Sequence, residues 1–221
     1  MAVHDARELE RNTMVDCQVR PNHVSDTRVT VAMRSLPREA FAPSGASTAA
    51  IAYGDADIPL GQGRYLFNPL LTARLAQTAL SGNPAHALVL GAGSGYLAAV
   101  LSAAGVNVVA LEEEARLDTG ALELYAPRVG TARGNLAAGW PAGGPYDVIV
   151  LEGAVPEIPA ILAAQLTPGG RVVAVLADSG TDGIGRAVLA EPAGKGYAVR
   201  RLFDCTARLL PQFRVAPAFS F

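Results

Sequence analysis

Three closely spaced glycines follow an apolar run near the middle of the chain. Ala87–Leu90 are apolar, and Gly91, Gly93 and Gly95 come directly after them. Glycine permits backbone angles, and a close approach of a ligand, that a Cβ atom would prevent. The pattern therefore predicts a buried strand that ends in a loop able to hold a phosphate or a nucleoside. A tight turn between a strand and a helix is the alternative, because glycine marks such turns in many chains.

The spacing of these glycines distinguishes between nucleotide-binding loops. A dinucleotide fingerprint needs its third glycine one place after Gly95, where this chain has Tyr96. Gly-x-Gly-x-Gly after a strand is instead typical of the loop that binds S-adenosylmethionine in methyltransferases. Leu97–Ala104 have a helix-compatible composition. A helix there would place its N-terminal amide groups behind the loop, facing a ligand.

A second apolar run, Val106–Leu111, predicts a strand that ends at Glu112. An acid at the end of the second strand, about twenty residues beyond the first glycine, can accept hydrogen bonds from both hydroxyls of a ribose. The alternative is a solvated acidic helix start, which the helix dipole favours. We favour the ribose role for Glu112 and the helix start for Glu113 and Glu114.

Composition limits the classes of function. The chain has 221 residues, of which 50% are hydrophobic and 17% are charged, and its net charge is −2. This length suits one α/β domain with an extension. The small net charge offers no general field for nucleic acid or for anionic lipid. No apolar run is long enough to span a bilayer. We therefore expect neither a nucleic-acid partner nor a membrane partner.

Histidines and cysteines are few and scattered. His4, His23 and His86 are isolated, and no cluster has the spacing of metal ligands, so we expect no metal site. Cys17 and Cys205 lie far apart in sequence, which suits a reducing compartment. The N-terminal residues lack the apolar segment of a secretory signal. We expect a cytoplasmic protein, either a monomer or a small homo-oligomer.

Helices and strands must alternate to bring these residues together. We expect strands at 87–91, 106–112, 129–132, 147–151, 171–176, 197–203 and 213–221, and helices at 5–19, 25–35, 70–80, 95–104, 115–126 and 158–166, with a helical turn at 37–41. Ser25 and Asn68 are the expected N-caps. Such alternation predicts a mostly parallel sheet covered on both faces, with the last two strands antiparallel at its edge. Gly91–Tyr96, Glu112 and Glu152–Glu157 then meet at the carboxyl ends of the strands, where ligands bind.

Blocks of residues over most of the chain resemble the protein-L-isoaspartate O-methyltransferases. The blocks are Phe41–Pro43, Ala52–Asp55, Ile58–Gly61, Pro69 with its helix, Val89–Tyr96, Gly139–Pro141, Pro145–Val150, Ala154–Pro159 and Gln165–Arg171. The resemblance implies an α/β class I methyltransferase (Rossmann-like) fold with a mostly parallel seven-stranded sheet. It also implies a helical cap and substrate loop over residues 1–80 and a cofactor-binding core over residues 81–221, together one structural domain.

The resemblance further implies the cofactor, the substrate and the residues that hold the cofactor. The cofactor is S-adenosyl-L-methionine, the product is S-adenosyl-L-homocysteine, and the substrates are isoaspartyl carboxylates of damaged peptides or proteins. Carried over position by position, the cofactor-binding residues are Gly91, Ala92, Gly93, Ser94, Gly95, Tyr96, Glu112, Gly134 and Asn135. Glu112 takes the ribose hydroxyls. Gly134 and Asn135 contact the adenine, without the acid that the family usually has there.

The chain departs from the family pattern at the acceptor loop. The family reads Thr-Ile-Ser-x-Pro, and its serine contacts the substrate, whereas this chain has Phe67 at the serine position. Val89 also replaces an acid two places before the first glycine. The candidate catalytic residues of this stretch are Arg64, Tyr65, Phe67 and Asn68. Arg64 either clamps an acceptor carboxylate or faces solvent, Tyr65 can donate its hydroxyl, and Phe67 can plug the acceptor pocket.

Methyl transfer to a carboxylate makes modest demands on the protein. The acceptor is already ionised at neutral pH, so no general base is needed and the protein mainly positions two reactants. Three hypotheses follow: a carboxyl methyltransferase for isoaspartyl residues, a methyltransferase with another acceptor, and a cofactor-binding regulatory protein without turnover.

Overall fold

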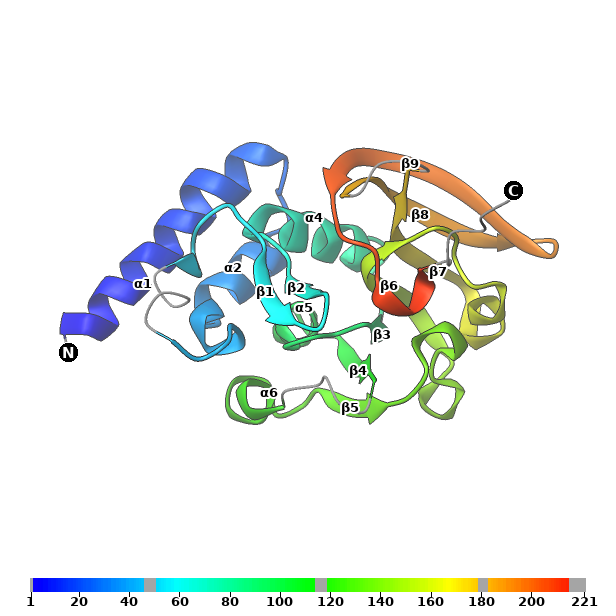
Figure 1. The fold of residues 1–221 in the computed structure, drawn as a ribbon, viewed down its shortest axis with the longest axis horizontal. Helices are drawn as coiled ribbons and strands as arrows, with labels where there is room; N and C mark the ends of the chain where they lie inside the picture. Colours follow the sequence, from blue (N-terminus) through cyan, green and yellow to red (C-terminus); the bar gives the residue numbers. More distant parts are fainter. Residues whose placement is uncertain (1, 46–50, 114–118, 179–182, 215–221) are drawn as a thin grey trace, which may run out of the picture.

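A seven-stranded sheet forms the centre of the computed structural model, which describes residues 2–45, 51–113, 119–178 and 183–214. The strand order is β5-β4-β3-β6-β7-β8-β9 (Figure 1). The strands are β3 (His86–Leu90), β4 (Asn107–Glu112), β5 (Gly130–Arg133), β6 (Tyr146–Val155), β7 (Leu166–Ala177), β8 (Ile184–Ala193) and β9 (Gly196–Thr206). Neighbours from β5 to β7 are parallel, and β8 and β9 are antiparallel. The predicted sheet is confirmed.

The direction of winding changes between β3 and β6. From β3 the chain proceeds through β4 and β5 on one side, and β6 and β7 lie on the other. Leu90 pairs with Leu111 of β4 and with Leu151 of β6. The next residues, Gly91, Glu112 and Glu152, therefore stand side by side at the carboxyl edge. Ligands of open parallel sheets bind at such a switch point.

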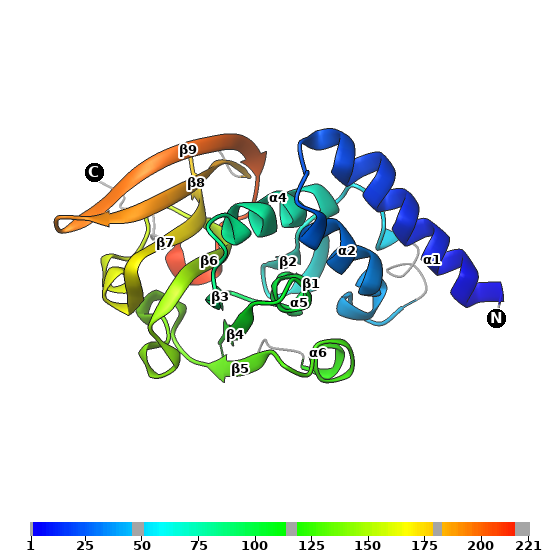
Figure 2. The same ribbon diagram turned by 180° about the vertical axis from the view of Figure 1, so that it is seen from behind.

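Helices of the N-terminal region and of the core share one face of the sheet. They are α1 (Ala2–Met14), α2 (Thr27–Ser35), α4 (Pro69–Leu80), α5 (Tyr96–Ala103) and the short α6 (Gly120–Tyr125). Side chains of α1, α2, α4 and α5 form one buried cluster with Ala87 and Val89 of β3, whereas Leu88 and Leu90 point into a second cluster on the opposite face. Figures 1 and 2 show α1 and α2 at one end of the molecule and the β8–β9 hairpin at the other.

The helix starts follow ordinary capping chemistry. Asn68 accepts a hydrogen bond from the amide of Leu71 at 2.9 Å, and Pro69 occupies the first position of α4. This cap is confirmed. The prediction of Ser25 as a cap is wrong, because Asp26 accepts from the amide of Arg28 at 2.9 Å and α2 begins one residue later.

Several predicted elements differ from the structure. Two hairpins were not expected: β1 (Ile58–Gly61) with β2 (Arg64–Leu66), and β8 with β9. The helix expected at 158–166 is a 3₁₀ turn over Ala160–Gln165. Of the strand expected at 213–221, Phe213 lies in a 3₁₀ turn that Arg214 ends. Residues 215–221 lie outside the described residues, as do residues 115–118 of the helix expected at 115–126.

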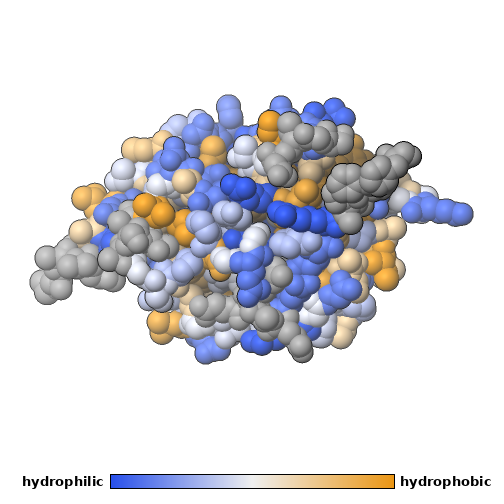
Figure 3. All heavy atoms as spheres, viewed as in Figure 1, coloured by the Kyte–Doolittle hydropathy of each residue, from blue (hydrophilic) through white to orange (hydrophobic). Residues whose placement is uncertain are grey.

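Hydrophobic residues on the face seen in Figure 3 are scattered among hydrophilic ones. Among the described residues, no helix combines the length and the apolar character needed to cross a membrane.

Candidate functional site

The glycine loop joins β3 to α5 in a conformation that depends on glycine. Gly91 has a φ of +74° and Gly93 a φ of +55°, in the left-handed region. A Cβ atom on Gly91 would lie 2.7 Å from Nη2 of Arg64, and one on Gly93 would lie 2.9 Å from Leu60. The amides of Gly91 and Ala92 donate to the carbonyl of Leu111 at 2.9 and 3.2 Å, which ties the loop to the end of β4.

Glu112 is fully buried beside this loop. Its Oε2 accepts from the amide of Gly93 at 2.9 Å, and its Oε1 accepts from the amide of Glu113 at 3.0 Å. The alternative of a solvated helix start is therefore wrong for Glu112. A buried carboxylate that already accepts an amide of the loop has the position that the ribose role requires.

Arg64 extends from β2 onto the same carboxylate. Its Nη2 and Nε lie 2.9 and 3.3 Å from Oε2 of Glu112, and its Nη2 also donates to the carbonyl of Gly91. The side chain is 6% exposed, so the alternative of a solvent-facing arginine is wrong. With the two amides, four N–H groups now lie on Glu112, three of them on Oε2 and one on Oε1. Each carboxylate oxygen has about two lone-pair positions, so Oε1 has room for one more donor and Oε2 has none. Two ribose hydroxyls can therefore bind Glu112 only if at least one of these donors leaves.

A cavity of about 190 Å³ lies against the glycine loop. Gly93 and Ser94 of the loop, Leu60 and Arg64 of the β1–β2 hairpin, and residues 40–43 contribute to its lining. The hydroxyl of Ser94 is buried there without a hydrogen-bond partner among the described residues. An unsatisfied hydroxyl, a cradle that Cβ atoms would fill and a buried carboxylate fit a nucleoside-type cofactor such as S-adenosylmethionine.

A second buried acid, Glu152, ends the apolar run of β6 next to Gly91. Glu152 is 5% exposed, and its Oε2 has no hydrogen-bond partner among the described residues. Burial raises the pKa of Glu152 to about 8. The charge of Arg64 opposes this rise, and the charge of Glu112 adds to it.

Arg38 and Tyr96 extend this buried polar region toward the N-terminal helices. Arg38 is fully buried and donates to the carbonyls of Ala52, at 2.7 Å, and of Phe67. Its Cζ lies 5.0 Å from the centre of the Tyr96 ring. Burial raises the pKa of Tyr96 to about 12, so its hydroxyl keeps its proton.

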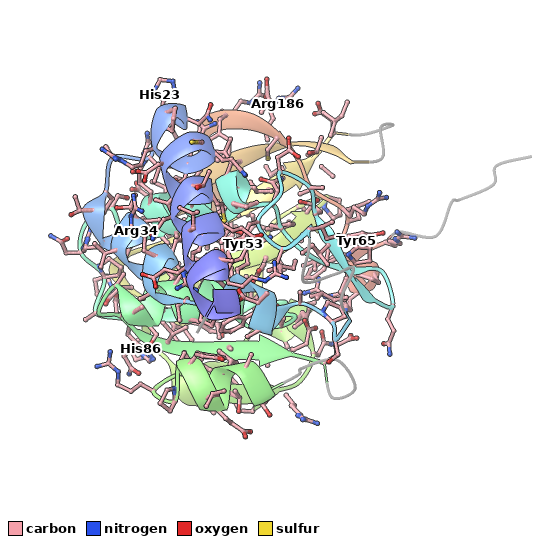
Figure 4. All side chains as sticks on the ribbon, turned by 90° about the vertical axis from the view of Figure 1, so that its left-hand side faces the viewer. His23, Arg34, Tyr53, Tyr65, His86 and Arg186 are labelled. Atoms are coloured by element: carbon pink, nitrogen blue, oxygen red, sulfur yellow. The ribbon has the colours of Figure 1, made fainter. Side chains whose placement is uncertain are left out.

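The other candidate catalytic residues do not line the cavity. Tyr65 is half-buried, and the guanidinium of Arg208 lies 4.7 Å from its ring centre. Figure 4 shows Tyr65 on the opposite side of the molecule from Arg34, with Tyr53 between them. Phe67 is 2% exposed within the core, and the side chain of Asn68 caps α4. The structure thus brings only Arg64 of this group to the glycine loop.

The predicted adenine segment lies beside the backbone of Glu112. The amide of Gly134 donates to the carbonyl of Glu112 at 3.0 Å, and a Cβ on Gly134 would lie 3.5 Å from the Trp140 ring. Asn135 uses its side-chain oxygen to accept from the amide of Ala137 at 2.9 Å. Val89, where the family has an acid, is fully buried in the core. Within the described ranges no group of three or more His, Cys, Asp and Glu could hold a metal.

The sequence placed Glu152 at the ligand-binding edge of the sheet without giving it a chemical role, and it assigned nothing to Arg38. Glu152 had a usable signal, since it follows Val148–Leu151 as Glu112 follows its own apolar run. Arg38 gave none, because nothing local distinguishes a buried arginine from an exposed one in a short polar turn.

Comparison with known proteins identifies the family. The sequence profile of the family described as Protein-L-isoaspartate(D-aspartate) O-methyltransferase (PCMT) matches residues 9–188. A protein-L-isoaspartate O-methyltransferase of Methylorubrum extorquens is 40% identical over 171 residues, which cover 76% of this chain and 74% of that protein. One from Methanoculleus marisnigri is 36% identical over 175 residues, covering 77% and 78%.

Solved structures support the fold. A Plasmodium falciparum protein assigned to the same enzymes, crystallised with S-adenosyl-L-homocysteine, superposes with a TM-score of 0.77 at 17% identity, covering 91% of this chain and 98% of that one. A second protein-L-isoaspartate O-methyltransferase has a TM-score of 0.75 at 24% identity, covering 92% of this chain and 65% of that one. The chain belongs to the protein-L-isoaspartate (D-aspartate) O-methyltransferase family.

Proposed function

We propose that this protein is an S-adenosylmethionine-dependent O-methyltransferase that methylates isoaspartyl carboxylates in damaged proteins. The observation that carries the proposal is the pairing of a glycine loop with buried Glu112 at the switch point of the sheet, in a chain 40% identical to a protein-L-isoaspartate O-methyltransferase. S-adenosyl-L-homocysteine is the second product.

The cofactor-binding residues are proposed from their positions. Gly91 to Tyr96 provide the loop and the first residue of α5, Glu112 provides a carboxylate for the ribose, and Gly134 and Asn135 follow β5 beside Glu112. The unsatisfied hydroxyl of Ser94 supports this assignment. When bound, S-adenosylmethionine supplies an electrophilic methyl group on a positively charged sulfur.

The protein's contribution is to position the acceptor and to exclude water. An isoaspartyl carboxylate, with an ordinary pKa near ~4, is ionised at neutral pH and carries the electron pair that it needs. Holding two reactants in line contributes roughly 7–11 kcal/mol to catalysis. A site at the end of an apolar sheet suits this task, because Leu90, Leu111 and Leu151 below it are buried.

Arg64 links cofactor binding to acceptor binding in this proposal. Of the four N–H groups on Glu112, two belong to the backbone at Gly93 and Glu113 and two to the Arg64 side chain. The side chain is the donor able to leave when ribose hydroxyls arrive. The displaced guanidinium is then a cation beside the loop, and we assign it the acceptor carboxylate as its new partner.

The remaining parts of the proposal concern organisation and location. We propose residues 1–80 as a cap with the substrate loop and residues 81–221 as the cofactor-binding core, since the described helices of the first part pack on the sheet of the second. Cys17 and Cys205 are free cysteines, which supports a location in the reducing cytoplasm.

The test is transfer of labelled methyl from S-adenosylmethionine to a peptide that contains isoaspartate, with the aspartyl peptide as the control. Label on the isoaspartyl peptide alone supports the proposal. Label on other components of a lysate, with none on the peptide, indicates another acceptor, which Phe67 in place of the family's serine would favour. Calorimetric binding of the cofactor without any transfer indicates a regulatory protein.

A further inference from the structure

The strongest unused feature is the buried acid beside the glycine loop. Glu152 follows Leu151, the partner of Leu90, and so stands next to Gly91 at the switch point where ligands of such sheets bind. Its Oε2 is buried and has no partner among the described residues. Buried polar atoms are nearly always hydrogen-bonded, and an exception calls for an explanation such as a missing ligand.

Glu152 faces charged groups from three other elements. Glu112 lies at the end of β4, Arg64 extends from β2, and Arg38 comes from the 3₁₀ turn over Arg38–Phe41. Arg64 lines the cavity against the loop and has the largest effect of these charges on Glu152. Both arginines have other partners: Arg64 donates to Glu112 and Gly91, and Arg38 to the carbonyls of Ala52 and Phe67.

Protonation decides what Glu152 can do. Burial, with the charge of Glu112 added, raises its pKa to about 8 despite the two arginines, so the carboxyl group is mostly neutral at pH 7. A neutral carboxyl group has one O–H donor, whereas an ionised one only accepts hydrogen bonds and repels an anionic substrate.

We propose that Glu152 contacts the methyl acceptor as a neutral acid and donates a hydrogen bond to the isoaspartyl carboxylate. This inference rests on the proposed function. Glu152 would supply a hydrogen-bond donor in place of the serine hydroxyl that the family resemblance expects, since Phe67 has no such donor and lies in the core. The acceptor oxygen provides the electron pair of the new O–CH₃ bond as the S–CH₃ bond breaks. No proton moves, and Glu152 keeps its own.

The experiment compares Glu152→Gln and Glu152→Ala with the parent protein across pH. Glutamine keeps a donor of the same shape but cannot ionise, and alanine removes the donor. We expect kcat/KM of the parent for an isoaspartyl peptide to fall as pH rises through about 8. Glu152→Gln keeps activity without this fall. Glu152→Ala loses about 10- to 150-fold at neutral pH, as expected for a hydrogen bond to a charged group.

Controls separate this effect from a change of fold. Glu191→Gln makes the same substitution at an exposed position of β8 and leaves kcat/KM and its pH profile unchanged. Calorimetry with S-adenosyl-L-homocysteine checks that each variant binds the cofactor product. Label is counted in the ester and in released methanol, because methyl esters hydrolyse faster at high pH.

Three outcomes overturn the inference. If Glu152→Gln is as inactive as Glu152→Ala and the parent's rate rises with pH, Glu152 acts as a base. If both variants equal an active parent, Glu152 does not contact the acceptor, while the proposed function stands. A parent that transfers no label to the peptide refutes the proposed function and this inference together.

Discussion

Replacement of Arg64 should change the affinities for cofactor and acceptor in opposite directions. Arg64→Met removes the two N–H groups that Arg64 places on Oε2 of Glu112, at 2.9 and 3.3 Å, and keeps a side chain of similar length. A hydrogen bond to a charged group contributes about 1.5–3 kcal/mol net. If ribose hydroxyls no longer have to displace Arg64, the Kd for S-adenosyl-L-homocysteine should fall by about 10-fold or more.

The same substitution should weaken acceptor binding and destabilise the ligand-free protein. Without the guanidinium, the KM for an isoaspartyl peptide should rise by about 10-fold, because one charge-assisted contact is lost. The unfolding free energy should fall by about 3 kcal/mol, since Glu112 is fully buried and loses its cation. Calorimetry, initial rates and urea denaturation measure the three effects separately.

The matched control is Arg186→Met, which removes an arginine from an ion pair with Asp178 whose two side chains are 37% and 33% exposed. It should change neither affinity. Unchanged or weaker binding of S-adenosyl-L-homocysteine by Arg64→Met would refute the idea that Arg64 competes for Glu112. Tighter binding with an unchanged KM for the peptide would leave the competition in place but remove the acceptor role.

Three further predictions concern stability. The pKa of Glu152 is about 8 in the folded protein and 4.5 ordinarily, so the unfolding free energy should fall as pH rises between these values, by about 1.4 kcal/mol per pH unit. Glu152→Gln should abolish this slope, measured by urea denaturation at several pH values. Burial alone would raise the pKa of Asp147, but hydrogen bonds from the amides of His86 and Ala85 and from the Thr167 hydroxyl together lower it. The ionised Asp147 therefore stabilises the fold above pH 3.8, and this stabilisation is lost as pH falls through the lower pKa of the folded protein. Asp147→Ala should therefore cost about 2 kcal/mol at pH 7 and less in acid, and an equal loss at every pH would contradict this. Phe67→Ser should lower the unfolding free energy by about 3–5 kcal/mol without raising methyl transfer, because Phe67 is 2% exposed in the core; a stable and more active variant would instead place it in the acceptor pocket.

The central parallel strands β3 and β4 were predictable because they are continuous apolar runs that end in recognisable residues. Leu90 gives way to glycine and Leu111 to Glu112, and these ends coincide in the register of the sheet. Asn68 before Pro69 marked the start of α4 for the same reason, since capping is local chemistry.

The hairpins were harder to recognise. Gln62 and Gly63 both have positive φ, as a two-residue hairpin turn requires, but β1 and β2 are short and β1 contains Pro59. The strand β8 contains Gly185 and Pro192, which disfavour a strand in isolation. Backbone pairing with both neighbours, β7 and β9, stabilises it in the folded protein.

The contacts of Arg64 were beyond sequence reasoning. Arg64 and Glu112 are 48 residues apart, and their ion pair exists only because the β1–β2 hairpin lies over the glycine loop. The functional role of Arg64 stays a prediction. In the described structure its charged partner is the carboxylate of Glu112.

Arg38 restricts which segments can be exchanged between relatives of this protein. Its guanidinium binds the carbonyls of Ala52 and Phe67, and so joins two segments that flank the hairpin. A chimaera that replaces residues 1–80 must bring along an arginine that satisfies both carbonyls, and side chains that match Ala87 and Val89 on the recipient sheet. Grafting the substrate loop alone into a relative without an arginine at this place would bury two backbone carbonyls without a side-chain donor.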